Sequence, residues 1–202
     1  GIEPLGPSPI GRAELLAELE LPPDARLVGL VGRLWPQKRV KDAIWAADLL
    51  KVIRGDVHLL ILGDGPHRDR LRRYRDQVLI GDKVHFLGQR DDAAHMIPHF
   101  DVLWSTSGYE GQSNAIMEAM SAGVPVVATD IPGTRDLVAP EVTGCLFPIG
   151  DRALLAKRTN QILNDPDLAR RLGEAAKTRM ANEFIVERMV GSYAELYREI
   201  IQ

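Results

Sequence analysis

One apolar run of strand length constrains the fold of this 202-residue chain more than any other feature. It extends from Arg26 to Gly32 and reads R-L-V-G-L-V-G, with no alternation of apolar and polar residues. A strand that is covered on one face alternates, whereas a strand that is covered on both faces does not. An amphipathic segment, Arg39 to Ile53, separates this run from the next predicted strand, Val57 to Leu62. The order strand, helix, strand therefore predicts buried parallel strands.

The alternation of strands and helices continues along the chain. Further strands are expected at Val84–Leu87, Val102–Trp104, Pro125–Ala128 and Gly144–Phe147. Further helices are expected at Arg12–Glu20, Pro66–Gln77, Asp91–Met96, Gly133–Val138, Arg152–Leu163, Leu168–Glu183 and Ile185–Ile201. This pattern favours an α/β fold, a Rossmann-like open and mostly parallel sheet with helices on both faces, in one domain.

Two predicted helices carry an apolar stripe at helical spacing. In the first, the stripe consists of Ala43, Ala46, Ala47, Leu50 and Ile53. In the last helix it consists of Ile185, Met189, Tyr193, Leu196, Tyr197 and Ile200. A stripe of this kind predicts a buried helix face, and the simplest interpretation of the second one is packing on this domain.

Composition excludes several classes of protein. The formal net charge of −3 is not that of a strongly basic nucleic-acid binder. No apolar run approaches the roughly 20 residues that a membrane-spanning helix needs, and the first residues lack the layout of a signal peptide. The single cysteine, Cys145, is interpreted as a small buried apolar residue, and a reducing, cytoplasmic setting is expected.

Two glutamates, Glu110 and Glu118, lie in the stretch Y-E-G-Q-S-N-A-I-M-E-A-M-S-A-G-V-P-V-V-A-T-D, which starts at Tyr109. Gly, Ser and Asn favour the loop and cap before a helix, and the Ala, Ile and Met that follow favour the helix itself. Glu110 is therefore expected on a loop and Glu118 on the second turn of a helix, roughly 12 Å away if the intervening residues were all helical. The start of this helix suits a phosphate group because its free N–H groups point outward.

This stretch resembles the E-x7-E segment of the retaining GT-B glycosyltransferases, specifically glycosyltransferase family 4. The family pattern reads roughly E-G-x-x-N-x-x-x-E-A-M-A-x-G-x-P-V-V-A, and nearly every fixed position is matched here. Three more motifs follow the family's order, G-R-L-x-x-x-K, L-G-x-G-P and V-x-F-L-G. The resemblance covers nearly the whole chain and corresponds to the C-terminal, donor-binding half of such an enzyme. In the resembled family the last helix crosses back to the other domain, which implies, as an alternative to packing on this domain, that part of the stripe in the last helix has its partner outside this chain.

Arg33 and Lys38 lie in G-R-L-W-P-Q-K, directly after the first strand. Loops at the carboxyl ends of parallel strands line the ligand crevice in this class of fold, and both cations can neutralise a diphosphate. In the resembled family this arginine and lysine hold the nucleotide diphosphate. Glycine usually follows the lysine in the family, whereas this chain has Arg39, so the shape of the loop is expected to differ.

Glycines and main-chain groups make up the rest of the predicted site. Gly32, Gly63 and Gly65 are expected to form turns that allow the backbone to approach the ligand. The segment containing His85 and Phe86 resembles the one whose main chain meets the nucleobase.

Gly133 takes the place of the family's glycine pair, which contacts the sugar. The polar run Ser105-Thr106-Ser107 lacks the G-x-S-x-G pattern of a nucleophile, and it is interpreted as a loop that leads to Glu110.

The resemblance implies retaining transfer of a sugar from a nucleotide donor. Glu118 would accept hydrogen bonds from the ribose, and Glu110 would contact the donated sugar near its reacting carbon. Arg33 and Lys38 would stabilise the departing diphosphate, helped by the helix that begins near Ser113, Asn114 and Ala115. The donor, a UDP- or GDP-sugar, is a substrate, so no cofactor is expected.

No metal site is expected. The histidines lack metal-ligand spacing, and Asp165-Pro166-Asp167 is interpreted as a helix cap despite its formal D-x-D pattern.

The expected partners are the donor and an N-terminal acceptor domain of a longer protein. Residues 1–10 would be the remnant of an inter-domain linker, and residues 11–202 the donor domain, including the helices over 152–201. No nucleic acid is expected as a partner, and any peripheral membrane contact would come through the missing domain. The isolated domain is expected to be inactive.

Two alternatives stay open, a sugar-nucleotide epimerase of the same architecture and a non-catalytic nucleotide-binding domain. A nicotinamide-binding domain is disfavoured because no G-x-G-x-x-G follows the first strand.

Overall fold

One parallel sheet forms the centre of the molecule. The computed structural model describes residues 1–3, 5–6 and 8–201, and in that part of the chain six strands pair in the order β3-β2-β1-β4-β5-β6. Every pairing is parallel. The strands are β1 (Arg26–Val31), β2 (Val57–Leu62), β3 (Val84–Gly88), β4 (Val102–Ser105), β5 (Val126–Thr129) and β6 (Cys145–Phe147). The predicted Rossmann-like sheet is confirmed.

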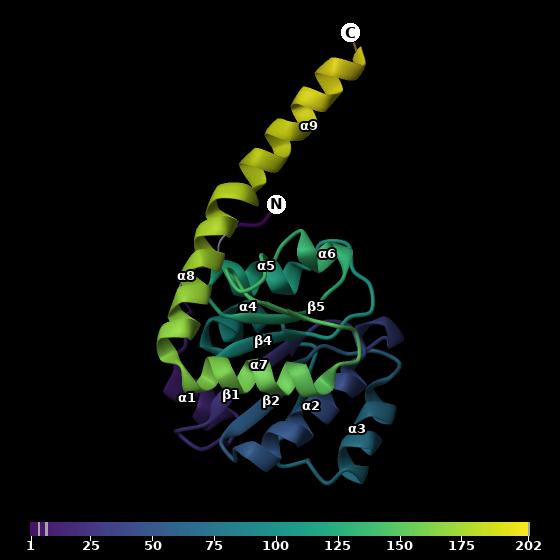
Figure 1. Ribbon diagram of the computed structural model, residues 1–202, viewed down its shortest axis with the longest axis vertical. Coiled ribbons are helices and arrows are strands. Elements are labelled where there is room, and N and C mark those ends of the chain that lie inside the picture. The colour runs from purple at the N-terminus through teal and green to yellow at the C-terminus, as the bar shows by residue number, and fades with distance from the viewer. Residues whose placement is uncertain (4, 7, 202) are drawn as a thin grey trace.

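Helices cover both faces of this sheet (Figure 1). They are α1 (Arg12–Glu18), α2 (Val40–Ile53), α3 (Arg68–Gln77), α4 (Ala93–Met96), α5 (Asn114–Ser121), α6 (Pro132–Arg135), α7 (Arg152–Asn164), α8 (Pro166–Glu183) and α9 (Val186–Ile201), with short 3-10 turns η1 (Pro36–Lys38) and η2 (Ile97–His99). Side chains of α2, α3 and α7 form one apolar core against the sheet, and those of α1, α4, α5 and α8 form the other. The strands are therefore buried on both faces, which explains why they do not alternate.

Strands are added to the sheet in one direction from β1 to β3 and in the opposite direction from β4 onward. From β1 the chain proceeds outward through β2 to β3, and it then returns to place β4 on the other side of β1. The loops after β1 and β4 diverge at such a switch point, and they leave a crevice at the carboxyl ends of the strands. The predicted cations follow β1, and the first predicted glutamate follows β4.

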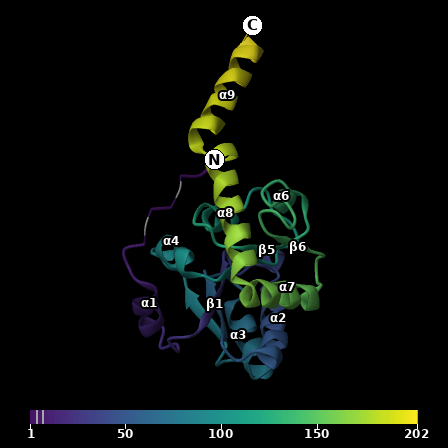
Figure 2. The same ribbon diagram turned by 60° about the vertical axis from the view of Figure 1, so that its left-hand side comes forward.

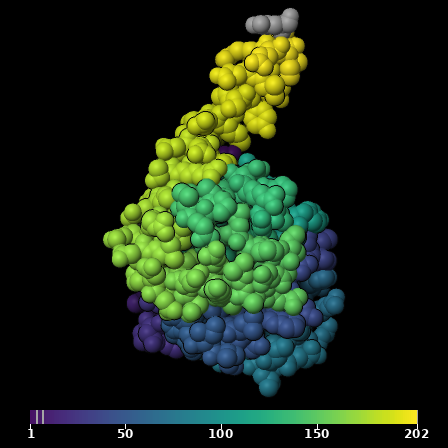
Figure 3. Space-filling model, viewed as in Figure 1, coloured from purple at the N-terminus to yellow at the C-terminus, as the bar shows by residue number. Residues whose placement is uncertain are grey.

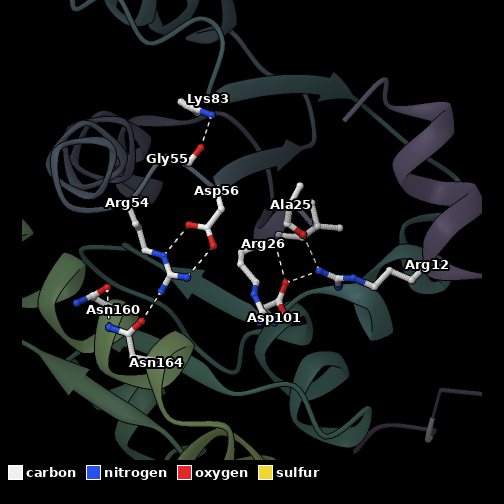
Figure 4. A network of polar contacts seen from close by, with 11 residues as sticks. Arg12, Ala25, Arg26, Arg54, Gly55, Asp56, Lys83, Asp101, Asn160 and Asn164 are labelled. Carbon is white, nitrogen blue, oxygen red and sulfur yellow. Dashed lines mark hydrogen bonds and ion pairs between the residues drawn. The ribbon is translucent and has the colours of Figure 1, made fainter. Parts of the chain in front are cut away.

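At the opposite end of the sheet, where the strands begin, Asp101 immediately precedes β4 and connects neighbouring elements (Figure 4). Its carboxylate accepts hydrogen bonds from Arg12 Nη2 at 2.6 Å, Arg26 Nη1 at 3.0 Å and the main-chain N–H of Leu27 at 2.7 Å. The contacts of Asp101 join α1, β1 and β4 on the side away from the crevice. Figure 4 also shows Arg54, at the end of α2, bonded to Asp56 and to Asn164.

Helix α9 extends from the body of the molecule as an arm (Figure 2). None of its residues is buried, and Tyr197 and Ile200 are 62% and 70% exposed. The space-filling view shows the same arm standing clear of the rounded domain (Figure 3). The predicted stripe therefore does not pack on this domain over its length. At the base of the arm, Ile2 pairs with Ile185 and donates a hydrogen bond to the carbonyl of Phe184.

The structure confirms some local predictions and corrects one. In the stripe of α2, four residues are buried but Ile53 is 59% exposed, because the helix ends there. Cys145 is buried, as predicted, and burial raises the pKa of its thiol to about 11. Within the predicted linker, Ile2, Leu5 and Ile10 pack against the second core, whereas Pro4 and Pro7 lie outside the described residues.

Candidate functional site

Lys38 and Glu110 meet at the switch point, although 72 positions separate them in the sequence. Lys38 ends η1 after β1, and Glu110 lies on the loop that precedes α5. The ammonium group of Lys38 donates a short hydrogen bond to Glu110 Oε1, and Ser107 Oγ donates to the same oxygen at 2.6 Å. The two charged side chains are only 19% and 12% exposed. Each charge is therefore partly shielded from water and compensated by the other.

Three more hydrogen bonds join the loops on which these two residues lie. Thr106 Oγ1 donates to the carbonyl of Lys38, and the N–H of Gly108 donates to the carbonyl of Gln37, both at 2.7 Å. Tyr109 Oη donates to Gln37 Oε1, also at 2.7 Å. The loop after β1 and the loop after β4 therefore form one connected rim.

A buried chain of hydroxyl groups supports this rim from behind. Thr134 Oγ1 donates a short hydrogen bond to the carbonyl of Thr129, and Thr129 Oγ1 donates to the carbonyl of Ser107 at 2.6 Å. All three residues are at most 2% exposed. The sequence did not single out Thr129 or Thr134. Ser107 belongs to the run Ser105-Thr106-Ser107 before Glu110, which the sequence indicated only as a polar loop.

Gly133 lies directly behind the loop that carries Glu110. A Cβ atom at this position would fall 1.9 Å from the carbonyl oxygen of Gly111 and 2.3 Å from that of Glu110. The structure does not bring Gly133 into the cavities described below. Its visible role is to let α6 pack against the main chain of the loop, and its predicted contact with a sugar stays a prediction.

A cavity of about 580 Å³ opens in front of the Lys38–Glu110 pair. It contains eight of the predicted site residues, namely Gly32, Arg33, Lys38, Glu110, Ser113, Asn114, Ala115 and Glu118. Ser113 is the N-cap of α5 and its side chain makes no capping hydrogen bond, so the first N–H groups of the helix face the cavity without that partner. The start of a helix attracts anions.

Glu118 lies on the second turn of α5, as predicted, and is half-buried. Burial raises the pKa of its carboxyl above the ordinary value. Among the residues that the structure describes, its carboxylate has no hydrogen-bond or ion-pair partner. A half-buried carboxylate without a partner at a cavity wall is able to accept hydrogen bonds from a ligand.

Arg33 lies at the junction of this cavity with a second one of about 370 Å³. It is exposed, and within residues 1–3, 5–6 and 8–201 its guanidinium has no polar partner. Gly63 lines the second cavity, with a φ of +130°. A Cβ there would fall 2.1 Å from the carbonyl oxygen of Gly32, and one at Gly65 would fall 2.8 Å from Leu34 N. These glycines allow the turn after β2 to pack against the turn after β1.

His85 and Phe86 lie on β3, outside both cavities. His85 Nε2 is 3.0 Å from Nδ1 of buried His58, and the ring of Phe86 lies 5.7 Å from the guanidinium of Arg75. Burial, followed by the charge of nearby Lys83, lowers the pKa of His58 to about 4. The side chains of His85 and Phe86 are therefore engaged elsewhere, and the predicted contact with a base concerns their main chain.

Arg39, at the position where the resembled family usually has glycine, has a left-handed backbone conformation. Its φ and ψ are 49° and 36°, in the left-handed region that glycine adopts most readily. Its guanidinium pairs with buried Asp42, with an Nη2–Oδ2 distance of 2.6 Å. Arg39 therefore adopts a backbone conformation that glycine adopts readily, and the expected difference in loop shape from the family stays a prediction.

In the part of the chain that the structure describes, no group of three or more His, Cys, Asp or Glu side chains could hold a metal ion. Asp165 caps α8 by accepting a hydrogen bond from Leu168 N at 2.9 Å, and Pro166 begins the helix. The interpretation of this D-x-D as a cap is confirmed. None of the described helices is long and apolar enough to cross a membrane.

Comparisons with known proteins agree with this arrangement. The family model described as glycosyl transferases group 1 matches residues 11–179. N-acetyl-alpha-D-glucosaminyl L-malate synthase of Bacillus anthracis is 31% identical over 82% of this chain and 43% of its own length. A GDP-mannose-dependent alpha-mannosyltransferase of Mycolicibacterium smegmatis is 34% identical over 96% of this chain and 49% of its own length. The chain thus spans about half the length of these curated relatives.

Solved structures show the same architecture. HepE of Anabaena, solved in complex with UDP, has a TM-score of 0.86 and 26% identity over 93% of this chain and 52% of HepE. TarM of S. aureus, solved in a complex that contains UDP, has a TM-score of 0.82 at 26% identity over 86% of this chain and 36% of TarM. Because the family model matches most of the chain and the motifs meet in one crevice, this chain belongs to the glycosyl transferases group 1 family.

Proposed function

We propose that this chain is the donor-binding half of a retaining glycosyltransferase of family 4, and that it holds a nucleoside-diphosphate sugar in the cavity at the switch point. The observation that carries the proposal is that one cavity brings together Arg33, Lys38, Glu110, Glu118 and the start of α5. An elongated ligand with a ribose, a diphosphate and a sugar would use these groups in turn.

The diphosphate would lie between Arg33 and the N-terminus of α5. Arg33 has a free guanidinium among the described residues, and Lys38 retains donor capacity beyond its contact with Glu110. A guanidinium and an ammonium both form strong hydrogen bonds with phosphate oxygens. As the bond between the anomeric carbon and the phosphate oxygen breaks, the electron pair leaves with the diphosphate. These cations would stabilise that charge.

Glu118 would bind the ribose, because its carboxylate lies at the cavity wall without a partner in the described part of the chain. Glu110 would accept hydrogen bonds from the donated sugar. One of its oxygens already accepts from Lys38 and Ser107, which fixes the carboxylate in place. A carboxylate held in this way is a poorer covalent nucleophile than a free one. The acceptor hydroxyl would therefore attack from the face that the diphosphate leaves, and pass its proton to the departing phosphate.

The nucleobase would occupy the second cavity, beside Gly63 and Gln89. Gln89 and Arg90, which follow β3, line this cavity, and this supports a role in base binding for the segment that contains His85 and Phe86. The structure of a neighbour with UDP-glucose and the name of a GDP-mannose-dependent relative support a nucleotide-sugar donor as a class. Either UDP or GDP is consistent with the cavity.

The acceptor would be bound by a second domain of a longer protein, with residues 1–10 as part of the linker and residues 11–202 as the donor domain. The exposed stripe of α9 supports this division because an apolar helix face outside the domain core needs another surface to cover it. The donor domain alone would bind nucleotide but transfer no sugar.

The test is calorimetric titration of the chain with UDP, GDP and ADP. Arg33→Gln is expected to weaken binding of the preferred nucleotide by about tenfold or more, because a charge-assisted contact is lost. Arg72→Gln, an exposed arginine on α3 with the same change in charge, is the matched control. Equal affinity of wild type and Arg33→Gln would overturn the placement of the diphosphate.

Retention is tested on the full-length protein. Proton NMR of the product formed with a UDP- or GDP-hexose and an added acceptor gives the configuration at the anomeric carbon. The proposal expects the α-configuration of the donor to be kept. An inverted product would contradict the mechanism and leave the binding assignment intact.

A further inference from the structure

A second, strongly basic cavity lies between α2 and α3, beside the donor cavity. Its volume is about 590 Å³, and Trp35 lines both cavities. The lining cations are Arg39 and Lys41 at the start of α2, Arg70 and Arg73 on α3, and Arg152 at the start of α7. Among the described residues that line this cavity, only Asp42 carries a carboxylate.

Asp42 cannot balance this set of charges. It is 5% exposed, and both of its oxygens are occupied. Oδ2 accepts from Arg39 Nε at 2.8 Å, and Oδ1 accepts from Arg152 Nε at 2.6 Å. Within residues 1–3, 5–6 and 8–201, Lys41, Arg70 and Arg73 donate to no hydrogen-bond acceptor of the protein. The cavity therefore has a positive charge that the protein itself does not compensate.

Two other arginines of α3 do have carboxylate partners. Arg68 pairs with Asp64 at 3.0 Å and Arg75 with Asp76 at 2.7 Å, both outside the cavity lining. The chain as a whole has 28 acidic and 25 basic residues, so carboxylates are not scarce. Like charges placed three residues apart on a helix repel each other. A cavity whose walls carry cations without partners raises the local concentration of anions.

The aromatic side chains of the cavity give it a partly apolar wall. The ammonium group of Lys41 lies 4.3 Å from the centre of the Tyr74 ring, which directs it across the groove. Trp35 is 48% exposed and borders the opening. Guanidinium groups bind phosphate oxygens in a fork, and an ammonium group adds a point charge.

We propose that this cavity binds a phosphate-bearing ligand through Lys41, Arg70 and Arg73, at a site distinct from the one proposed for the donor diphosphate. The shared chemistry is one or two phosphate groups on a compact carrier. The carrier is either a small free molecule or the headgroup of an anionic lipid. This inference does not depend on the nucleotide-binding proposal, because Arg70 and Arg73 line only the basic cavity.

The first experiment titrates inorganic pyrophosphate into the chain that carries Arg33→Gln, so that the donor cavity contributes little. Adding Arg70→Gln and Arg73→Gln is expected to reduce the affinity by about tenfold or more. The control adds Arg72→Gln and Arg171→Gln, which change the net charge equally at exposed positions outside the cavity, and it is expected to stay within about twofold. UDP binding by the Arg70→Gln/Arg73→Gln variant without Arg33→Gln is expected to be unchanged.

The second experiment identifies the carrier by co-sedimentation with phosphatidylcholine vesicles, with and without phosphatidylglycerol. Binding to the anionic vesicles that is lost in Arg70→Gln/Arg73→Gln, and kept in the control, supports a lipid headgroup. Pyrophosphate binding without vesicle binding supports a small free ligand. The inference is overturned if the wild type binds neither probe, or if the control loses as much affinity as the cavity variant.

Discussion

Ser107 Oγ donates a 2.6 Å hydrogen bond to the Glu110 oxygen that also accepts from Lys38. Ser107 is only 2% exposed, and its main-chain carbonyl accepts a hydrogen bond from Thr129 Oγ1. A carboxylate with two donors on one oxygen keeps its orientation while the other oxygen stays available. Ser107 is therefore a positioning residue for Glu110.

Removal of this donor is expected to slow transfer more than it weakens donor binding. For Ser107→Ala in the full-length protein we expect kcat to fall by about tenfold, since a hydrogen bond to a charged group contributes about 1.5–3 kcal/mol. The KM for the donor should change little, and Ser107→Thr should recover part of the rate. Steady-state kinetics measure both. Ser105→Ala is the control, and an equal loss of rate there would refute the positioning role.

Gly133→Ala is expected to destabilise the domain because the added methyl group overlaps the carbonyl oxygens of Gly111 and Glu110. Overpacking of this kind costs about 1–3 kcal/mol, which corresponds to a fall in Tm of about 2–12 °C for a domain of this size. Thermal unfolding followed by circular dichroism measures the change. Gly55→Ala is the control, since a Cβ there meets nothing within 4 Å. A Tm equal to that of the control would show that the loop moves aside freely.

The half-buried carboxyl of Glu118 is expected to make the domain less stable as the pH rises from acidic to neutral. Burial raises the pKa of its carboxyl in the folded state, so folding favours the protonated form. This contribution to stability is complete below the ordinary pKa of glutamate and is lost as the pH rises through the raised value. Relative to wild type, Glu118→Gln should therefore gain stability between acidic and neutral pH. Urea unfolding of both proteins across that range measures the difference, and parallel curves would contradict it.

The same substitution should weaken nucleotide binding. In the proposed binding mode the carboxyl group would accept hydrogen bonds from two ribose hydroxyls, and an ionised carboxylate is the stronger acceptor. We expect UDP or GDP to bind Glu118→Gln about tenfold more weakly at neutral pH, with a smaller loss at acidic pH. Calorimetric titration at both pH values tests this, with Gln77→Ala as an exposed control on α3.

Two substitutions at Arg39 can separate the cost of its left-handed backbone conformation from the stabilisation that its ion pair with Asp42 provides. Arg39→Ala keeps the positive φ and loses the contact with Asp42, and we expect it to lower the free energy of unfolding by about 1–2 kcal/mol. Arg39→Gly loses the same contact but relieves the strain, so it should be more stable than Arg39→Ala by about 1 kcal/mol. Urea unfolding of the two variants measures the difference. Equal stabilities would mean that the turn relaxes when the arginine is removed.

The sequence predicted the sheet and its covering helices because unalternated strands and amphipathic helices are local patterns. Glu118 on the second turn of its helix, the cap at Asp165 and the burial of Cys145 follow from the same kind of local evidence. The exposure of Ile53 was missed because the end of a helix is set by one or two residues that the stripe does not include.

The support behind the site could not be predicted in this way. Lys38 and Glu110 were each assigned from their own loop, but no local pattern states that their side chains pair across 72 positions. Gly133 was placed beside the sugar by its position in a motif, whereas its missing side chain is required by the packing of α6 behind the loop. Contacts of this kind depend on which strands become neighbours, and only the complete fold determines that.

The pairing of β1 with β4 at the switch point is also the shortest strand pairing in the sheet. These strands align over two residue pairs, Val28 with Val102 and Gly29 with Leu103, whereas β1 and β2 align over six. The Lys38–Glu110 pair crosses this pairing at one end and Asp101 crosses it at the other. A ligand that contacts both loops would add a third connection between β1 and β4. Its binding energy would therefore oppose separation of strands β3-β2-β1 from strands β4-β5-β6. Slower amide hydrogen exchange in β1 and β4 together would then report occupancy of the crevice, even at residues that the ligand does not touch.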